Sequence, residues 1–553
     1  MRIVDFLARA PRKDLWQMGL LTAVAGLSNA LLVVVINKVA ASVARGQQPG
    51  EWPAVTFVSA FGVYFLCNRK AMLTANTTIE RLLKGLRTDI ADQLRQSSLT
   101  AVDRMGRGTL ISILAKETNH LSVTFPILIE TVQQALLLLA STVYLGTLSI
   151  PALLMFLAAV AIGIAGHIRV DRSFRATQEQ IAVTQAALLD AIRDLIHGSK
   201  ELRLHRAKSD AVYAAYRKLS RWAERLFTQS AGHWSSQIVV GSFIMYNMLA
   251  LVVFVYPKYF ETGGASLMPF RLVPVLLFCI GALSRIVAQS PMFVRAEMGL
   301  QAIFTVEQEL AAGRGATTAE ARQHAERFQD FQEIEYTGIR YPYRDAAGEA
   351  VFQSGPWNLK LTRGEMVFLV GGNGSGKSTA LRLLTGLYEP EEGQITVDGK
   401  IVAPAEIAGL REQFSAIFGD FHLFDRLYGM EDAQPDEVNA LIADMGLGKK
   451  VRYANGRFTD LHLSTGQRKR LALITALLED RPIYVFDEWS AEQDVHFREE
   501  FYTRVLPSLK AKGKTVVAAT HDERFWHLAD RVVKMDLGCI VWERAGSDPR
   551  GVV

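Results

Sequence analysis

Gly371-Gly372-Asn373-Gly374-Ser375-Gly376-Lys377-Ser378-Thr379 identifies the fold class of the last third of this chain. The apolar run 367–370 precedes it, and a helical pattern follows at 379–387. A strand, a glycine-rich loop and a helix in this order form a P-loop, whose backbone N–H groups approach phosphates at a positive helix N-terminus. Lys377 has the length to reach the outer phosphates of ATP, and Ser378 is placed to hold Mg²⁺. The expected ATP-binding residues are Gly371, Asn373, Gly374, Ser375, Gly376, Lys377, Ser378 and Thr379.

Two further apolar strands end in residues suited to ATP hydrolysis. Residues 483–488 end in two carboxylates, Asp487 and Glu488. Asp487 suits Mg²⁺, directly or through water, and Glu488 suits polarising the attacking water as general base. Residues 516–522 form another buried strand, and its His521 can hydrogen-bond the γ-phosphate and orient that water. We therefore predict Glu488 and His521 as the catalytic residues.

A second phosphate motif, Leu463-Ser464-Thr465-Gly466-Gln467, lies between the P-loop and these strands. The P-loop alone indicates a nucleotide. The two motifs together indicate an ATPase whose site closes only when two copies meet. Because the chain contains one P-loop, a machine with two sites must be a dimer of this chain.

The part of the chain before the ATPase motifs is strongly apolar. Over 553 residues, 49% are hydrophobic and 21% are charged, whereas soluble domains carry about 25% charged residues. A bilayer span needs about 20 apolar residues, and we predict six spans. They cover residues 15–37, 52–68, 131–168 (two spans with a tight turn near Ser149-Ile150-Pro151), 226–257 and 268–292.

Six spans place both termini on the same side of the membrane. Basic residues at the N-terminus and around residues 69–70 and 169–172 fall on that side, which makes it cytoplasmic. We therefore expect a multi-pass protein of the bacterial inner membrane, in contact with the lipid bilayer, with its ATPase domain in the cytoplasm.

Two segments between spans are long, charged and helical in pattern, at residues 79–98 and 171–227. They are too polar for lipid, so we interpret them as helices that extend out of the membrane. Small-residue breaks follow or interrupt them at Gly106-Arg107-Gly108 and Gly198-Ser199-Lys200-Glu201. Such a break suits a short helix lying across a partner domain; an ordinary helix–turn–helix is the alternative.

Polar side chains occur inside the predicted spans. Because charge in hydrocarbon is costly, such groups usually face a water-filled cavity. The alternative is that the ionised ones lie near span ends and reach the interface. The residues are Glu130, Gln133, Gln134, Gln237, Asn247, Arg285 and Gln289.

These patterns predict a membrane all-α six-helix transmembrane domain fused to a cytoplasmic α/β P-loop ATPase domain. We place the transmembrane domain at 1–312, a linker at 313–327 and the ATPase domain at 328–553. The net charge is +5 and no dense Lys/Arg tract occurs, so we expect no nucleic-acid partner. The three cysteines are far apart and form neither a metal spacing nor a disulfide framework.

The P-loop, LSTGQ, Asp487-Glu488, Asp494 and His521, in this order, resemble the ATP-binding cassette (ABC) family. The six preceding spans with two cytoplasmic excursions resemble its exporter branch, of type I fold. The resemblance implies that LSTGQ residues contact ATP held by the other subunit, and that Asp494 lies in the loop linking the two sites. It also implies that Tyr343 stacks on adenine, with Tyr341 as the competing residue. The expected ATP contacts in LSTGQ are Ser464, Thr465, Gly466 and Gln467.

Three stretches resemble a narrower branch, the bacterial exporters of peptide siderophores, cyclic peptides and lipopeptides. They are Gly198-Ser199-Lys200-Glu201-Leu202, Phe421-His422-Leu423-Phe424-Asp425 and Asp487-Glu488-Trp489-Ser490-Ala491-Glu492-Gln493-Asp494. The resemblance implies a homodimer that exports a modified peptide, with the cargo and the enzymes that make it as partners. A lipid or multidrug exporter and a membrane-bound ATP sensor or regulator are the alternatives.

The chain departs from the family pattern at two loops. The family's Q-loop glutamine should stand at Gly419, and glycine cannot perform its Mg²⁺ and coupling chemistry. Asp420 is the predicted replacement as a Mg²⁺ or water contact, with Gln413 as another possibility. The loop that usually reads Ser-Ala-Leu-Asp is Ala491-Glu492-Gln493-Asp494 here and retains only the Asp.

Overall fold

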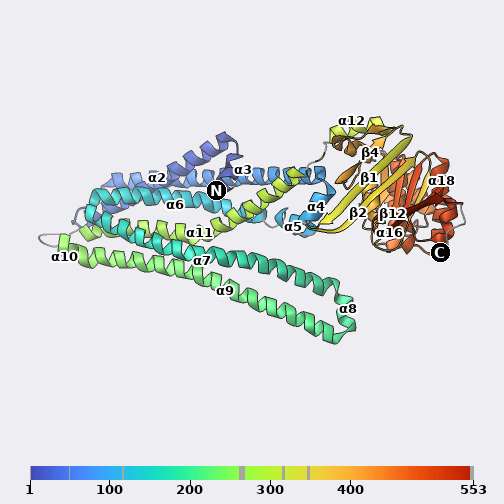
Figure 1. The fold of residues 1–553 in the computed structure, drawn as a ribbon. Coiled ribbons are helices and arrows are strands. Elements are labelled where there is room, and N and C mark those ends of the chain that lie inside the picture. Colours follow the sequence, from blue (N-terminus) through green and yellow to red (C-terminus); the bar gives the residue numbers. More distant parts are fainter. Residues whose placement is uncertain are drawn as a thin grey trace. The chain divides into compact units, whose positions relative to one another are not determined.

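The computed structural model describes residues 2–547, apart from 49, 115–117, 261–267, 314, 316–317 and 345–348. The chain divides into two compact units (Figure 1). The first contains Met1–Ala91 and Arg107–Gln308, and the second contains Asp92–Gly106 and Glu309–Val553. The predicted domain boundaries stay predictions. Part of the predicted linker lies outside the described residues, and the described remainder is mostly helical.

The first unit is helical. It contains α1 (Arg2–Ala8), α2 (Arg12–Val43), most of α3 (Glu51–Gln96), α5 (Arg107–Ser112), α6 (Thr118–Leu148), α7 (Ile150–His197), α8 (Ser199–Leu204), α9 (Arg206–Ala250), the π-helical turn η2 (Leu251–Val255), α10 (Tyr256–Phe260) and most of α11 (Met268–Ala312).

The predicted tight turn between two spans is confirmed between α6 and α7. Ser149 alone separates the two helices, and its hydroxyl accepts a hydrogen bond from the Ala152 N–H as an N-cap. Pro151 occupies the first turn of α7, where a missing N–H costs nothing. The Ser149 hydroxyl also shares a 2.7 Å hydrogen bond with the Tyr256 hydroxyl, which fixes the turn against α10.

Five helices of the described chain are long and apolar enough to cross a membrane: α2, α6, α7, the α9–α10 run and α11. The second predicted span lies at the start of α3 and is not among them. Glu51 and Arg69 bound its apolar stretch, and Trp, Pro and Asn residues lower its hydropathy. α3 still packs into the same unit, because Ala71 and Ala75 are buried against Ile129 of α6. The second span stays a prediction.

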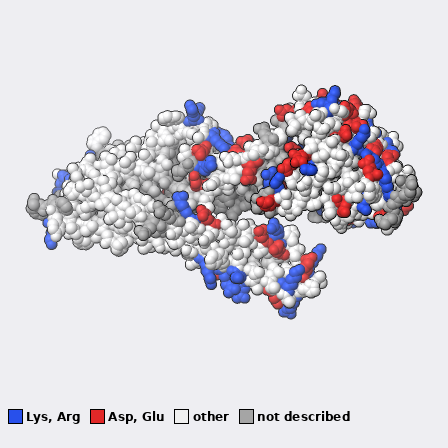
Figure 2. All heavy atoms as spheres, viewed as in Figure 1, with Lys and Arg blue, Asp and Glu red and all other residues white. Residues whose placement is uncertain are grey.

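The second predicted excursion is an antiparallel pair formed by α7 and α9, joined by α8 (Figure 1). Gly198 ends α7, and α8 follows as the short helix that the break predicted. On the face drawn in Figure 2, charged side chains gather at the α8 end of this pair, while few are seen along the pair toward α10. This pattern fits apolar spans that continue into aqueous extensions.

The second unit contains two main sheets and the helices around them. Its helices and helical turns are α4 (Leu99–Met105), α12 (Thr318–Phe328), α13 (Lys377–Leu384), η3 (Pro404–Glu406), α14 (Ile407–Arg411), α15 (Pro435–Asp444), α16 (Thr465–Glu479), η4 (Trp489–Glu492), α17 (Val495–Glu500), η5 (Phe501–Val505), α18 (Leu506–Ala511) and η6 (Glu523–Leu528). Its strands are β1 (Glu333–Arg344), β2 (Ala350–Thr362), β3 (Met366–Val370), β4 (Glu392–Val397), β5 (Lys400–Ile401), β6 (Phe414–Ile417), β7 (Tyr453–Ala454), β8 (Arg457–Phe458), β9 (Ile483–Asp487), β10 (Thr515–Ala519), β11 (Arg531–Asp536) and β12 (Cys539–Ala545).

The larger sheet positions the predicted site. Its strand order is β12-β11-β3-β10-β9-β6, and all pairings except β11–β12 are parallel. The carboxyl ends of β3, β10 and β9 therefore meet at one edge. The register aligns Ala519 with both Leu369 and Asp487. The P-loop follows β3, His521 follows β10 and Glu488 follows β9. These three parts of the predicted site therefore lie close together.

Both faces of this sheet are covered by core. Along β3, Met366, Phe368 and Val370 belong to one apolar cluster, and Val367 and Leu369 belong to the other. This alternation follows from the two-residue period of a strand. A parallel sheet buried on both faces holds its strand ends firmly, which suits a site built at one edge.

Candidate site for ATP binding and hydrolysis

The P-loop leaves β3 through glycines in conformations that side chains rarely adopt. Gly371 has φ of +150° and Gly376 has φ of +97°. A Cβ at Gly371 would lie 2.2 Å from the Met535 carbonyl oxygen, and one at Gly376 would lie 2.9 Å from the Gly538 Cα. Glycine is therefore required at both positions. The predicted helix is confirmed as α13, which begins at Lys377, two residues before the predicted start at 379.

Lys377 is folded back over this loop. Its side chain is 4% exposed, and its Nζ donates to the Gly371 and Gly372 carbonyl oxygens, both at 3.0 Å. Nζ also lies 3.4 Å from Glu488 Oε1. The ammonium is thus held where β- and γ-phosphates are expected, and it lies close to the predicted base.

Ser378 and Asp487 meet at the start of α13. The Ser378 hydroxyl donates to Asp487 Oδ1 at 3.1 Å. Burial raises the pKa of the Asp487 carboxyl, and the hydrogen bonds from Ser378 and the Gly419 N–H only partly offset this. A buried carboxylate beside a hydroxyl is an oxygen donor pair of the kind that Mg²⁺ accepts together with nucleotide phosphates. The two residues therefore fit the predicted metal role.

Glu488 and His521 are in direct contact. Glu488 Oε1 lies 2.7 Å from His521 Nε2, and Glu488 has φ of +47° directly after β9. A left-handed conformation at a residue other than glycine costs about 1 kcal/mol or more and is typical of functional sites. Burial acts to raise the pKa of Glu488, but the bonds from His521 and Lys377 outweigh it and hold that pKa below its usual value. Glu488 therefore stays ionised at neutral pH, as a general base must.

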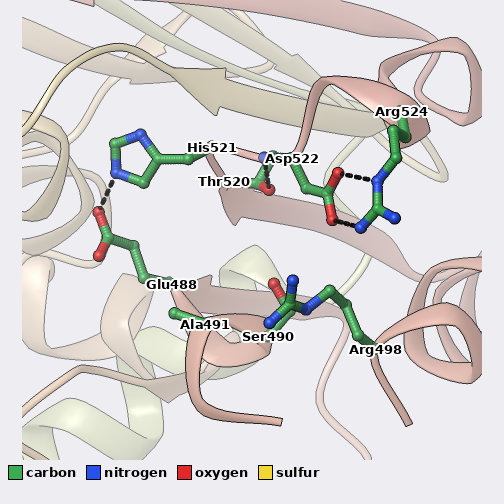
Figure 3. A pocket seen from close by; sticks show the side chains of 8 residues that line it. All are labelled: Glu488, Ser490, Ala491, Arg498, Thr520, His521, Asp522 and Arg524. Atoms are coloured by element: carbon green, nitrogen blue, oxygen red, sulfur yellow. Dashed lines mark hydrogen bonds and ion pairs between the residues drawn. The ribbon is translucent and has the colours of Figure 1, made fainter. Parts of the chain in front are cut away.

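These two side chains open onto a cavity of about 330 Å³ (Figure 3). Asp522 lies on its wall and accepts two hydrogen bonds from Arg524, at 2.8 and 2.7 Å. The Asp522 N–H donates to the Thr520 hydroxyl, which fixes the turn that carries His521. The turn after β10 is thus held by its own polar contacts before any nucleotide binds.

The LSTGQ motif forms the N-terminus of α16. The Ser464 hydroxyl accepts from the Gln467 N–H, and the Gln467 side chain accepts from the Ser464 N–H, which makes a capping box. Thr465 and Gly466 begin the first turn. The backbone N–H groups at a helix N-terminus can bind an anion. The geometry of this N-terminus therefore fits the predicted contact with a phosphate. The four ATP contacts expected here stay predictions.

Asp494 has a structural role within one chain that the sequence did not indicate. Its Oδ1 accepts from the Phe497 N–H as the N-cap of α17, and its Oδ2 accepts from Arg470 at 2.6 Å. Gln493 donates to the Gly466 carbonyl oxygen at 3.0 Å. The loop 491–494 is therefore tied to the LSTGQ helix of the same chain.

Sequence reasoning missed Lys469. This lysine of α16 is buried, and its Nζ donates to the Glu488 carbonyl oxygen at 3.0 Å and pairs with Glu492. It thereby holds the strained backbone of the predicted base from the LSTGQ helix. A lysine just after a phosphate motif gives no sequence signal for such a role, because the contact depends on where β9 ends.

The tyrosines before the P-loop are arranged differently from one another. The Tyr343 hydroxyl lies 3.1 Å from the Thr379 hydroxyl of the P-loop helix, whereas Tyr341 stacks on Tyr388 at 4.9 Å. Adenine stacking by Tyr343 stays a prediction.

The side chain of Asp420 lies 3.6 Å from Arg382, and the predicted Mg²⁺ role of Asp420 also stays a prediction. Gln413 donates to the Ala325 carbonyl oxygen. Within the described ranges, no three His, Cys, Asp or Glu side chains form a metal site of their own.

Known proteins resemble both parts of the chain. Residues 355–491 match the ABC transporter family. The ATP-binding protein SyrD of Pseudomonas syringae pv. syringae is 29% identical over 533 residues, which cover 94% of this chain and 92% of SyrD. An ATP-dependent lipid A-core flippase of Alkalilimnicola ehrlichii is 24% identical over 574 residues, which cover 96% and 91%. A macrolide export ATP-binding/permease protein MacB of Shewanella sp. is 31% identical over 201 residues, only 33% of this chain and 30% of MacB.

A solved structure extends the comparison to the fold. The chain of a bacterial Atm1-family ABC exporter with ATP bound matches with a TM-score of 0.75 and 17% identity, covering 99% of this chain and 95% of that one. At this identity the match concerns the fold alone. It spans the helical unit as well as the sheets, so the predicted fold class is confirmed.

Proposed function

We propose that this chain, which contains an ABC transporter domain and has the fold of an ABC exporter, is a half-transporter whose ATPase domain drives the export of a modified peptide of the cyclic, lasso or siderophore type. The proposed route leads from the cytoplasm across the bacterial inner membrane. The chain-long similarity to SyrD supports a peptide cargo. The similarly long match to a lipid A-core flippase makes a lipid the second candidate cargo.

The proposed machine is a homodimer with two composite ATP sites. Each chain contributes one P-loop and one LSTGQ helix. In the proposed dimer, the N-terminus of α16 faces the γ-phosphate held by the partner's P-loop. Two hydrogen bonds link each LSTGQ helix to the loop that follows Glu488. They join Gln493 to Gly466 and Asp494 to Arg470.

Hydrolysis follows from the contacts at the strand ends. Lys377 neutralises the outer phosphates, and Ser378 and Asp487 are the residues that would hold Mg²⁺, which supplies further charge neutralisation when bound. Glu488 takes a proton from the attacking water, and His521 keeps the Glu488 carboxylate oriented. The two subunits would close around ATP and separate after hydrolysis. This cycle would open the helical unit to one side of the membrane and then to the other.

A cavity in the helical unit is the observation that carries the proposed cargo site. It has a volume of about 370 Å³ and lies among α6, α7, α9 and α11. Most of its lining is apolar, with Gln237 and His167 among the polar groups. Gln237 is 5% exposed, and neither of its amide atoms has a partner among the described residues; the same holds for His167 Nδ1. Buried polar groups left unpaired are costly, so they suit a ligand with its own donors and acceptors, as peptide amides are.

A transport assay tests the cargo class. The chain is reconstituted in proteoliposomes, and ATP-dependent accumulation is measured for a cyclic lipopeptide, a peptide siderophore, a lipid A-core lipid and a macrolide. Accumulation of a peptide but not of the lipid supports the proposal. Selective movement of the lipid supports the second candidate. Nucleotide hydrolysis with no transport of any probe contradicts both and supports an ATP sensor.

Replacing Gln237 with Leu is expected to lower cargo-dependent accumulation about tenfold, because the site loses a buried hydrogen-bonding group that only a polar cargo satisfies. Binding of ATP should be unchanged. The measurement is the initial rate of accumulation of whichever probe the wild type transports.

Asn247→Leu is the matched control for Gln237→Leu. It changes an amide on the same helix, α9, but Asn247 is exposed, donates to the Phe243 carbonyl oxygen of its own helix and does not line the cavity. Equal losses in both variants would contradict the assignment of Gln237 to the cargo site.

A further inference from the structure

Helix α4 is packed on the ATPase unit, although it belongs to the segment between the second and third predicted spans. Residues 92–106 fall in the second unit. Leu99 of α4 contacts the core cluster that covers one face of the larger sheet. Asp103 accepts a hydrogen bond from the Tyr388 hydroxyl at 3.3 Å. The chain runs directly from α3 into α4, so movement of the helical unit can reach these contacts.

Tyr388 connects α4 to the helix that carries the P-loop. It is 4% exposed, and its hydroxyl accepts from Arg382 Nη1 at 3.2 Å. Arg382 lies on α13, whose first residue is Lys377. The same hydroxyl therefore joins a carboxylate on α4 to a guanidinium on the P-loop helix. Displacement of Asp103 would remove the carboxylate that accepts from this buried hydroxyl, which is costly.

Arg382 also reaches the loop where the family's glutamine is missing. Its Nη2 lies 3.6 Å from Asp420 Oδ1, next to Gly419. The side chain of the residue after Gly419 thus contacts Arg382 of the P-loop helix.

We propose that Asp103, Tyr388 and Arg382 form the coupling route between α4 and the ATP site, in place of a glutamine at Gly419. The three are positioning residues. Nucleotide bound at the P-loop fixes α13, Arg382 then fixes the Tyr388 hydroxyl, and Tyr388 holds Asp103 and α4. Because coupling is reciprocal, a displacement of α4 changes the affinity of the P-loop for nucleotide by the same factor. The proposal concerns coupling and is independent of the cargo.

Amide hydrogen exchange of the full chain in nanodiscs tests this route. Exchange is measured with and without Mg²⁺ and a non-hydrolysable ATP analogue. In the wild type, nucleotide should slow exchange at α13 and at α4. In Tyr388→Phe, slowing at α13 should persist, whereas the nucleotide effect at α4 should fall about fivefold or more. Asp103→Ala, which removes the acceptor, should reproduce this result, and the double variant should lose no more than either single one.

Two substitutions serve as controls for the relay. Tyr428→Phe removes the hydroxyl of an exposed tyrosine, and Asp92→Ala removes a carboxylate from the same segment as Asp103 that bonds Arg95 and Gln96 instead. Both should keep the wild-type response at α4. A wild-type α4 that does not respond to nucleotide, or a wild-type response in Asp103→Ala and Tyr388→Phe, overturns the proposal.

Discussion

Glu488→Gln is expected to hydrolyse ATP at least about 100-fold more slowly than the wild type, while it binds ATP with nearly unchanged affinity. A positioned general base typically contributes a factor of about 10²–10⁴. The amide of glutamine cannot take a proton from water, but its oxygen can still accept from His521. Steady-state hydrolysis by the chain in nanodiscs, measured beside equilibrium ATP binding, separates the two effects.

Of the two carboxylates at the end of β9, Glu488 has the geometry that suits a general base. It lies 2.7 Å from His521 Nε2 and 3.4 Å from Lys377 Nζ, and it is 37% exposed, so water can reach it. Asp487 is buried, with a raised pKa, and its Oδ1 accepts from Ser378. This environment suits a metal ligand rather than a base in contact with bulk water.

Glu492→Gln is the matched control for this substitution. Glu492 is also a carboxylate just after β9, and it pairs with Lys469 at 3.2 Å, but it does not line the cavity beside His521. Its hydrolysis rate should stay within about twofold of the wild type, since partly exposed ion pairs contribute little. Wild-type turnover in Glu488→Gln would reject Glu488 as the base.

The sequence predicted those parts of the site that are local in the chain. β3 with its glycine loop, β9 with its terminal carboxylates and β10 with its histidine are each readable from one continuous stretch. The sequence did not predict which of these strands are neighbours. The structure shows the order β3-β10-β9, and the carboxyl ends of these parallel strands meet at one edge.

Contacts that join distant stretches were not predictable in the same way. Lys469 reaches the Glu488 backbone only because α16 packs beside the end of β9. The bond between Asp103 and Tyr388 joins residues far apart in the sequence, and neither stands in a recognisable pattern. A one-dimensional motif fixes residue types at spacings, whereas these contacts depend on the tertiary packing of whole elements.

Lys377→Ala is expected to weaken ATP binding by about 10-fold or more and to reduce hydrolysis below detection. Removing a charged hydrogen-bonding group at a buried site costs about 1.5–3 kcal/mol, and the substitution removes the charge expected at the outer phosphates. It also leaves the Gly371 and Gly372 carbonyl oxygens without the donor that now holds them. Titration with a fluorescent ATP analogue measures the first effect, and phosphate release measures the second.

Two further variants make this result specific to the P-loop lysine. Lys510→Ala removes a 39% exposed lysine that pairs with Asp530, and it should bind and hydrolyse ATP as the wild type does. Lys377→Arg keeps the charge, but a planar guanidinium does not fit between the two carbonyl oxygens that Nζ bonds at 3.0 Å. We therefore expect Lys377→Arg to retain part of the binding and little of the hydrolysis. Full activity in Lys377→Ala would mean that phosphate charge is neutralised elsewhere, and the P-loop assignment would then fail.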